Sequence, residues 1–177
     1  MRTDDSLDPA TLDTLVPSTD TDLSATVFVK SLAPVACKDG QDRLVDGLDT
    51  LAERDVLDGV DLLVWGNSIC TGSPLSEVGS GQRIVDSIEE FYDLAADSQF
   101  SISPFFRVSN VTTEYSEGAF RRIVPPCRCI ALYERDSLAA VFPCVVDGTA
   151  YTPEDLVSYL TRQRTPAGER VLIDESA

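Results

Sequence analysis

Cysteine is the residue type in this sequence best suited to chemistry. Of five cysteines, three fall in one predicted hairpin, whose turn is centred on residues 135–136. This turn places Cys127 opposite Cys144, and Cys129, two residues further along, lies on the same face of the sheet. Three neighbouring thiolates could bind zinc in a tetrahedral site, with each sulfur about 2.3 Å from the metal. The chain has no histidine, so the fourth ligand would be another cysteine, Cys37 or Cys70, or a carboxylate.

Two other interpretations of these hairpin cysteines stay open. They could take part in redox chemistry, or they could be inert, because a buried cysteine behaves as a small hydrophobe. The other side chains on that face are typical of a core: Ala131, Tyr133, Leu138, Ala140 and Phe142. The number of cysteines is odd, and a chain of this size needs no cross-links to fold, which favours reduced thiols.

Cys37 is the better candidate for a reactive, catalytic thiol. It precedes a predicted helix, whose N-terminal dipole, together with Lys38, would favour the thiolate form. Asp39 and Asp42 act in the opposite direction. The alternative is an ordinary, partly buried cysteine.

The absence of histidine argues against an enzyme. It removes the commonest general base and the usual nucleophilic dyads and triads, so acid–base chemistry would fall to aspartate or glutamate. Among so many carboxylates no pair stands out by its spacing. We therefore expect a binding or regulatory module rather than a catalyst.

Arginines gather in the first predicted hairpin and just after it. Arg107, Arg121, Arg122 and Arg128 make this the only net-positive stretch of the chain, opposed there by two glutamates. Arginine could bind an acidic partner or a phosphate group through bidentate hydrogen bonds. The alternative is that the four residues pair with acidic side chains of the chain itself.

Nucleic acid is not the partner that the composition favours. Its affinity for proteins rests on neutralised phosphates and falls steeply with salt, and the chain has a net charge of −16. Nor does the sequence contain two short adjacent helices joined by a tight turn. We expect an unidentified protein partner instead, and a homodimer stays open.

The charge itself suggests a habitat. Thirty acidic side chains stand against 14 basic ones, and at ordinary ionic strength their repulsion would oppose compaction. At about 1 M salt the Debye length is roughly 3 Å, so neighbouring carboxylates scarcely interact. The composition thus favours a halophilic protein from a cytoplasm with molar salt. An ordinary protein with acidic tails is the alternative, although aspartates also recur in the predicted helices.

The length predicts one domain between two tails. Residues 1–23 are acidic, with little that could enter a core, and are expected to form a disordered tail. Residues 24–162 would form the domain, and residues 163–177 a loosely attached C-terminal tail. The sequence has no apolar run long enough for a membrane span and no signal peptide at its start, so we expect a cytoplasmic protein.

Hydrophobic periodicity predicts an α/β domain of about five or six strands and three helices. Strands are expected at 25–32 and 60–65, and amphipathic helices at about 44–52 and 84–95. Two hairpins follow, at 105–124 and 128–145, with turns at Ser116–Gly118 and Arg135–Asp136. Thr152 and Pro153 then predict a capped helix.

The order βαβα, then strands, then a helix resembles the thioredoxin-like fold over residues 24–162. In that alignment Pro125–Pro126 takes the place of the family's cis-proline. The family's C-x-x-C motif falls at 34–37, where Pro34 replaces the leading cysteine. The resemblance implies a thiol-dependent oxidoreductase centred on Cys37 or on the hairpin cysteines, but without the usual attacking thiol.

The amino-acid sequence is also similar to those of small acidic haloarchaeal proteins of unknown function, some of which are labelled helix-turn-helix proteins. The segments that carry this resemblance are VKSLAP, VDLLVWG and LYERDSLAAVFPCVVDGTAYTPEDL. It implies an archaeal, halophilic origin and brings no activity with it. A transcription-associated regulator is therefore a further alternative.

Overall fold

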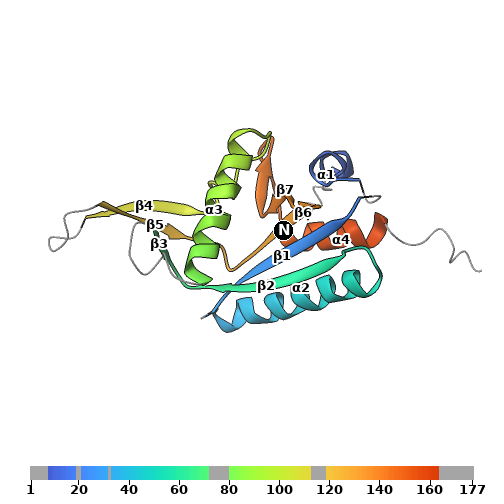
Figure 1. Ribbon diagram of the computed structural model, residues 1–177, viewed down its shortest axis with the longest axis horizontal. Coiled ribbons are helices and arrows are strands. Elements are labelled where there is room, and N and C mark those ends of the chain that lie inside the picture. Colours follow the sequence, from blue (N-terminus) through green and yellow to red (C-terminus); the bar gives the residue numbers. More distant parts are fainter. Residues whose placement is uncertain (1–7, 19–20, 32, 72–79, 113–118, 164–177) are drawn as a thin grey trace, which may run out of the picture.

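The computed structural model describes residues 8–18, 21–31, 33–71, 80–112 and 119–163 (Figure 1). In chain order its elements are α1 (Pro9–Leu15), β1 (Leu23–Lys30), α2 (Val35–Glu53), β2 (Gly59–Trp65), β3 (Ile69–Thr71), α3 (Ser80–Ala96), β4 (Arg107–Thr112), β5 (Ala119–Val124), β6 (Arg128–Glu134), β7 (Ser137–Phe142), β8 (Cys144–Val146), β9 (Thr149–Tyr151) and α4 (Pro153–Gln163). The predicted α/β class is confirmed.

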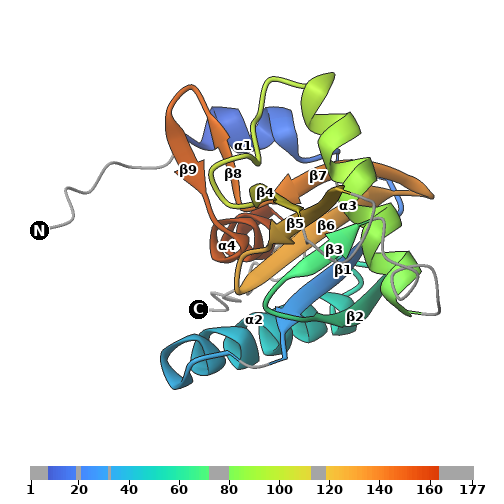
Figure 2. The same cartoon turned by 90° about the vertical axis from the view of Figure 1, so that its left-hand side faces the viewer.

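Four strands form the main sheet, in the order β2-β1-β6-β7. β1 runs parallel to β2 and antiparallel to β6, and β6 runs antiparallel to β7. The two central strands hold nearly continuous runs of buried residues, because helices cover both faces of this sheet. Helices α2 and α4 lie on one face and α3 on the other (Figures 1 and 2).

Helices α2 and α4 approach each other closely at Gly47. A Cβ atom at this position would lie 3.0 Å from Cγ1 of Val157 on α4. Helix α4 begins where the sequence predicts it, with a reciprocal cap. The Asp155 amide donates to the Thr152 hydroxyl at 3.3 Å, and the Asp155 carboxylate accepts from the Thr152 amide at 2.7 Å.

Aromatic rings fill the core between the main sheet and α3. The Phe28 and Trp65 rings stack with centroids 4.8 Å apart, and Phe91 meets Phe28 edge to face at 5.6 Å. Phe106 closes the cluster against Trp65. The indole nitrogen of Trp65 donates to the carbonyl of Pro126 at 3.2 Å, which connects this core to the segment between β5 and β6.

The second sheet, β3-β5-β4, is antiparallel and extends away from the main sheet (Figure 1). Its base packs on α3, where Ile123 is buried. Almost all of β4 is exposed. The predicted turn at Ser116–Gly118 lies outside the described residues.

The expectation of a disordered tail over residues 1–23 is wrong for residues 9–16. Asp8 caps α1 by accepting from the Ala10 amide at 3.0 Å, and Pro9 occupies the first turn. Leu12 and Val16 are buried in the main core, and Asp13 accepts a hydrogen bond from the Tyr159 hydroxyl on α4. Burial, then this bond and the charge of Asp13, raise the pKa of Tyr159 to about 12.

The described residues also hold more elements than predicted, nine strands and four helices. The expected strand at 138–145 is broken at a cis peptide bond, Phe142–Pro143, and continues as β8, which pairs with β9. The cis peptide bond therefore lies here and not at Pro125 or Pro126. The C-terminal tail prediction beyond Gln163 lies outside the described residues.

Candidate functional site

Strands β3, β4 and β5 form a positively charged surface, which we call the arginine ribbon (residues 69–71, 107–112 and 119–124). It contains three arginines, Arg107, Arg121 and Arg122, and no acidic residue. All three arginines are exposed. The ribbon thus concentrates positive charge in a chain whose net charge is −16.

Strand register divides the three arginines between the two faces of the ribbon. Arg107 pairs with Val124 and Arg122 with Ser109, so Arg107 and Arg122 are diagonal neighbours on one face. Arg121 points to the other face, toward α3, and lines a small hollow with Tyr92 and Val85. Burial raises the pKa of Tyr92, and the charge of Arg121 opposes this rise.

The fourth predicted arginine is not part of the ribbon. Arg128 lies in β6 of the main sheet, where its guanidinium forms an ion pair with Glu154 of α4. It also packs against α2, since a Cβ atom at Gly40 would lie 2.7 Å from Nη1 of Arg128. The alternative of pairing with the chain's own acids therefore applies to Arg128.

The three ribbon arginines differ from Arg128 in this respect. In the described part of the chain there is one further ion pair, between Arg83 and Asp61 at 3.1 Å. Arg107, Arg121 and Arg122 make no ion pair with any described residue. The two glutamates of the hairpin turn, Glu114 and Glu117, lie outside the described residues.

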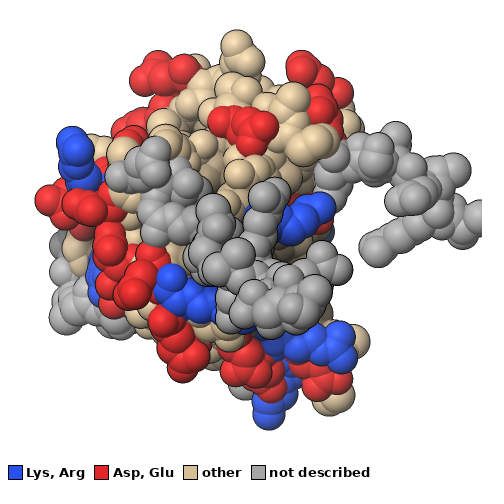
Figure 3. All heavy atoms as spheres, turned by 90° about the vertical axis from the view of Figure 1, so that its right-hand side faces the viewer, with Lys and Arg blue, Asp and Glu red and all other residues tan. Residues whose placement is uncertain are grey.

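The helices carry the opposite charge. Helix α2 has five acidic and two basic side chains, and α3 has four acidic and one basic. Helix α4 has two acidic and one basic side chain, and α1 has one aspartate. Figure 3, which shows the end of the molecule opposite the ribbon, has acidic side chains across much of its described surface, interspersed with basic ones.

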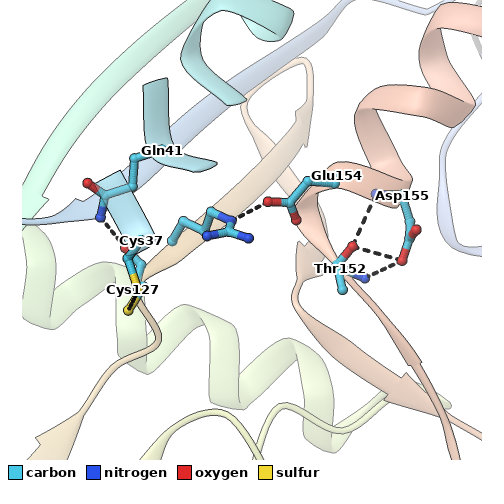
Figure 4. A network of polar contacts seen from close by, with 7 residues as sticks. Cys37, Gln41, Cys127, Thr152, Glu154 and Asp155 are labelled. Carbon is cyan, nitrogen blue, oxygen red and sulfur yellow. Dashed lines mark hydrogen bonds and ion pairs between the residues drawn. The ribbon is translucent and has the colours of Figure 1, made fainter. Parts of the chain in front are cut away.

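The structure divides four cysteines into two pairs. Cys37, in the first turn of α2, lies beside Cys127, which directly precedes β6, and the Cys127 thiol donates to Sγ of Cys37 at 3.2 Å (Figure 4). Both are half-buried. The hydrogen bond to Cys37, followed by burial, raises the pKa of Cys127, while Lys30 and Arg128 lower it.

Cys129 and Cys144 lie in the core. Burial raises the pKa of the Cys129 thiol well above its ordinary range, with a contribution from nearby Cys144. Burial also raises the pKa of Cys144 to about 12. Thiols of this kind are poor nucleophiles at neutral pH. Cys70 is exposed on the ribbon.

The predicted pairing of Cys127 with Cys144 is wrong. The turn at Arg135–Asp136 is as expected, but the register shifts by one residue between Leu132 and Tyr133, so that Ile130 pairs with Phe142. This bulge, and the end of β7 at Phe142, separate Cys127 from Cys144. Within the described ranges no three cysteine, aspartate or glutamate side chains form a group that could hold a metal.

Gln41 is a site residue that the sequence did not reveal. It lies one turn after Cys37 on α2 and is buried, and its amide donates to the carbonyl of Cys127 at 2.8 Å. The amide of Lys30 donates to the same carbonyl at 3.0 Å. The signal available in the sequence was a polar residue, Gln41, at a position of the helix that is buried. Its partner, the carbonyl of Cys127, is too distant in sequence to be predicted.

Fold and site together define a mixed α/β protein with a projecting basic ribbon and a close thiol pair. The chain belongs to a family described as a helix-turn-helix domain, whose model matches residues 17–165. Neither the curated proteins nor the solved structures contain a match to this sequence. The sequence resembles small acidic proteins of which some are labelled helix-turn-helix proteins, and the family description confirms this part of the resemblance.

This membership weighs against our expectation that nucleic acid is not a partner. Helix-turn-helix is a term for DNA-binding domains. However, no two helices of the described residues follow one another without an intervening strand.

None of the described helices is long and apolar enough to cross a lipid bilayer.

Proposed function

We propose that this protein is a regulatory, transcription-associated module that contacts nucleic acid through the arginine ribbon. The observation that carries the proposal is the distribution of charge. The described helices are each net negative, whereas the ribbon has three exposed arginines and no acid. Family membership supports the regulatory class.

The shape of the ribbon suits this role. Antiparallel β-ribbons are used by several DNA-binding proteins to enter a groove, and arginine supplies both phosphate contacts and bidentate contacts to guanine. The pair β4–β5 extends away from the main sheet (Figure 1), so it could approach a duplex while the acidic helices stay at a distance. Arg107 and Arg122 on one face would then contact phosphates or base edges.

The acidic surface bears on specificity and habitat. In dilute salt this surface would repel phosphates over most of the molecule, and its carboxylates would repel one another. We propose that the protein works in the molar-salt cytoplasm of a halophilic archaeon, where this repulsion is screened. Contacts in brine would have to rely on short-range hydrogen bonds from arginine more than on long-range attraction.

We propose further that the main sheet and its helices form a thioredoxin-like unit. The order β2-β1-β6-β7, with only β1 and β2 parallel, supports this arrangement. So does the placement of α2 and α4 on one face and α3 on the other (Figure 2). In this view the arginine ribbon is added to the unit at two places in the chain, because β3 lies between β2 and α3, and β4 and β5 lie between α3 and β6.

Fluorescence anisotropy with a labelled mixed-sequence DNA duplex tests the proposed contact. The variant Arg107→Gln/Arg121→Gln/Arg122→Gln removes the ribbon charge, and we expect it to bind at least about tenfold more weakly, since each lost arginine contact costs about 1–3 kcal/mol. The matched control, Lys38→Gln/Arg43→Gln/Arg54→Gln, removes three exposed charges from α2 and its C-terminal end. Equal loss in both variants, or binding by neither the wild type nor the variants, would contradict the proposal.

A further inference from the structure

We propose that Cys37 and Cys127 are a reactive dithiol, which small disulfides oxidise reversibly to an intramolecular disulfide bond. This inference is independent of the ribbon. It rests on the contact between two half-buried thiols that lie far apart in sequence, with sulfur atoms 3.2 Å apart. A disulfide has an S–S distance of about 2.05 Å, so the two sulfurs need to approach by only about 1.2 Å.

The surroundings hold the two thiols in this position. The carbonyl of Cys127 accepts hydrogen bonds from the Lys30 amide of β1 and from the buried Gln41 side chain of α2. Gln41 and Cys37 are one turn apart on the same helix, so they reach Cys127 together (Figure 4). On the other side, Arg128 is held by Glu154 and packs against Gly40.

The two sulfurs have different roles in the exchange. Cys37 lies in the first turn of α2, and its Sγ accepts the hydrogen bond that the Cys127 thiol donates. The hydrogen bond to Cys37, followed by burial, raises the pKa of Cys127, so Cys127 keeps its proton for longer. Cys37 is therefore the attacking thiol and Cys127 the resolving one.

The reaction consumes one small disulfide, R–S–S–R. The Cys37 thiolate attacks one sulfur, which forms a mixed disulfide and releases R–S⁻. Cys127 then loses its proton and attacks Sγ of Cys37, which forms the Cys37–Cys127 bond and releases the second R–S⁻. Two electrons pass from the protein to the reagent, and the two thiol protons end on two molecules of R–SH. An excess of a dithiol such as dithiothreitol reduces the Cys37–Cys127 bond by the same kind of exchange, returns both cysteines to thiols and is itself oxidised to a cyclic disulfide.

The remaining three cysteines are not expected to form a disulfide bond under the same treatment. Cys129 and Cys144 are buried in the core, out of reach of a dissolved reagent. Cys70 is exposed, and we expect it to stop at the mixed disulfide. Oxidation should therefore link one pair out of the five cysteines in the sequence.

Peptide mapping of the folded protein in molar KCl tests the inference. After treatment with bis(2-hydroxyethyl) disulfide, acid quench and trypsin, we expect the peptide Ser31–Lys38 linked to Ile123–Arg128, each of which contains a single cysteine. The link should form equally in Cys70→Ser and disappear on treatment with dithiothreitol. In Cys127→Ser the reagent should remain on Cys37 as a mixed disulfide.

Two results would overturn the inference, and neither requires a variant to fold. One is wild-type protein that carries the reagent on both Cys37 and Cys127 without the link. The other is a link between Cys127 and a cysteine other than Cys37. The same treatment in guanidinium serves as the control for native geometry, because an unfolded chain should give a mixture of links instead.

Discussion

The five cysteines have very different surroundings in this protein. Cys70 is exposed, Cys37 and Cys127 touch each other at an edge of the core, and Cys129 and Cys144 lie within it. The sequence predicted a reactive Cys37 and offered an inert core as one alternative for the hairpin cysteines. It could not predict the contact of Cys37 with Cys127, because that contact depends on how the segment between β5 and β6 docks on α2.

The buried thiols predict a loss of stability at high pH. Cys144 has its pKa raised from 9.0 to about 12 by burial, so between these values the folded state binds more protons than the unfolded state. The free energy of unfolding therefore falls as pH rises, by up to about 1.4 kcal/mol per pH unit for this thiol. Below pH 9 its contribution is fully present.

Urea unfolding of wild type and Cys144→Ala between pH 7 and 10.5 measures this effect. The variant should be less stable at pH 7, because it leaves a small cavity. The difference between the two proteins should shrink above about pH 9, because only the wild type loses the thiol contribution. A difference that stays constant with pH would show that Cys144 titrates normally in the fold.

Elements with their own local signals were the most predictable. Thr152, Pro153 and Asp155 predicted α4, and short runs of apolar residues predicted β1, β2 and β6. Two further signals were present but not used. Asp8–Pro9 begins α1, and Asp147–Gly148, with positive φ at both residues, is the turn between β8 and β9. The bulge between β6 and β7 had no such signal.

The contact between α2 and α4 predicts a steric effect at Gly47. A side chain larger than methyl would push the helices apart, since a Cβ atom alone would lie 3.0 Å from Val157. We expect Gly47→Leu to lower the free energy of unfolding by about 1–3 kcal/mol. Asp49→Leu, at an exposed position of the same helix, is the control and should change it by less than about 0.5 kcal/mol.

At the scale of the whole molecule, charge separates the ribbon from the body. The sequence indicated both the basic stretch and the acidic excess, but it grouped Arg128 with the other three arginines. Only strand order shows that Arg128 belongs to the main sheet, where it has an acidic partner. Hydrophobic periodicity cannot show which of the two sheets Arg128 belongs to, because the two hairpins are adjacent in sequence.

The acidic body predicts stability that depends strongly on salt. We expect the midpoint of thermal unfolding to rise between 0.1 M and 2 M KCl, because screening reduces repulsion among the surface carboxylates. Sulfate at the same ionic strength would add a separate exclusion effect, so potassium chloride is the salt to use. Equal midpoints in dilute buffer and in brine would contradict the proposed habitat.

The salt dependence of DNA binding tests the central claim, that the arginine ribbon is the surface that contacts nucleic acid. The slope of log K against log [KCl] should be shallower for Arg107→Gln/Arg121→Gln/Arg122→Gln than for the wild type, by about 0.9 for each arginine that neutralises a phosphate. The α2 control variant should keep the wild-type slope. Equal slopes for the ribbon variant and the wild type would contradict the account, because the ribbon arginines would then neutralise no phosphates.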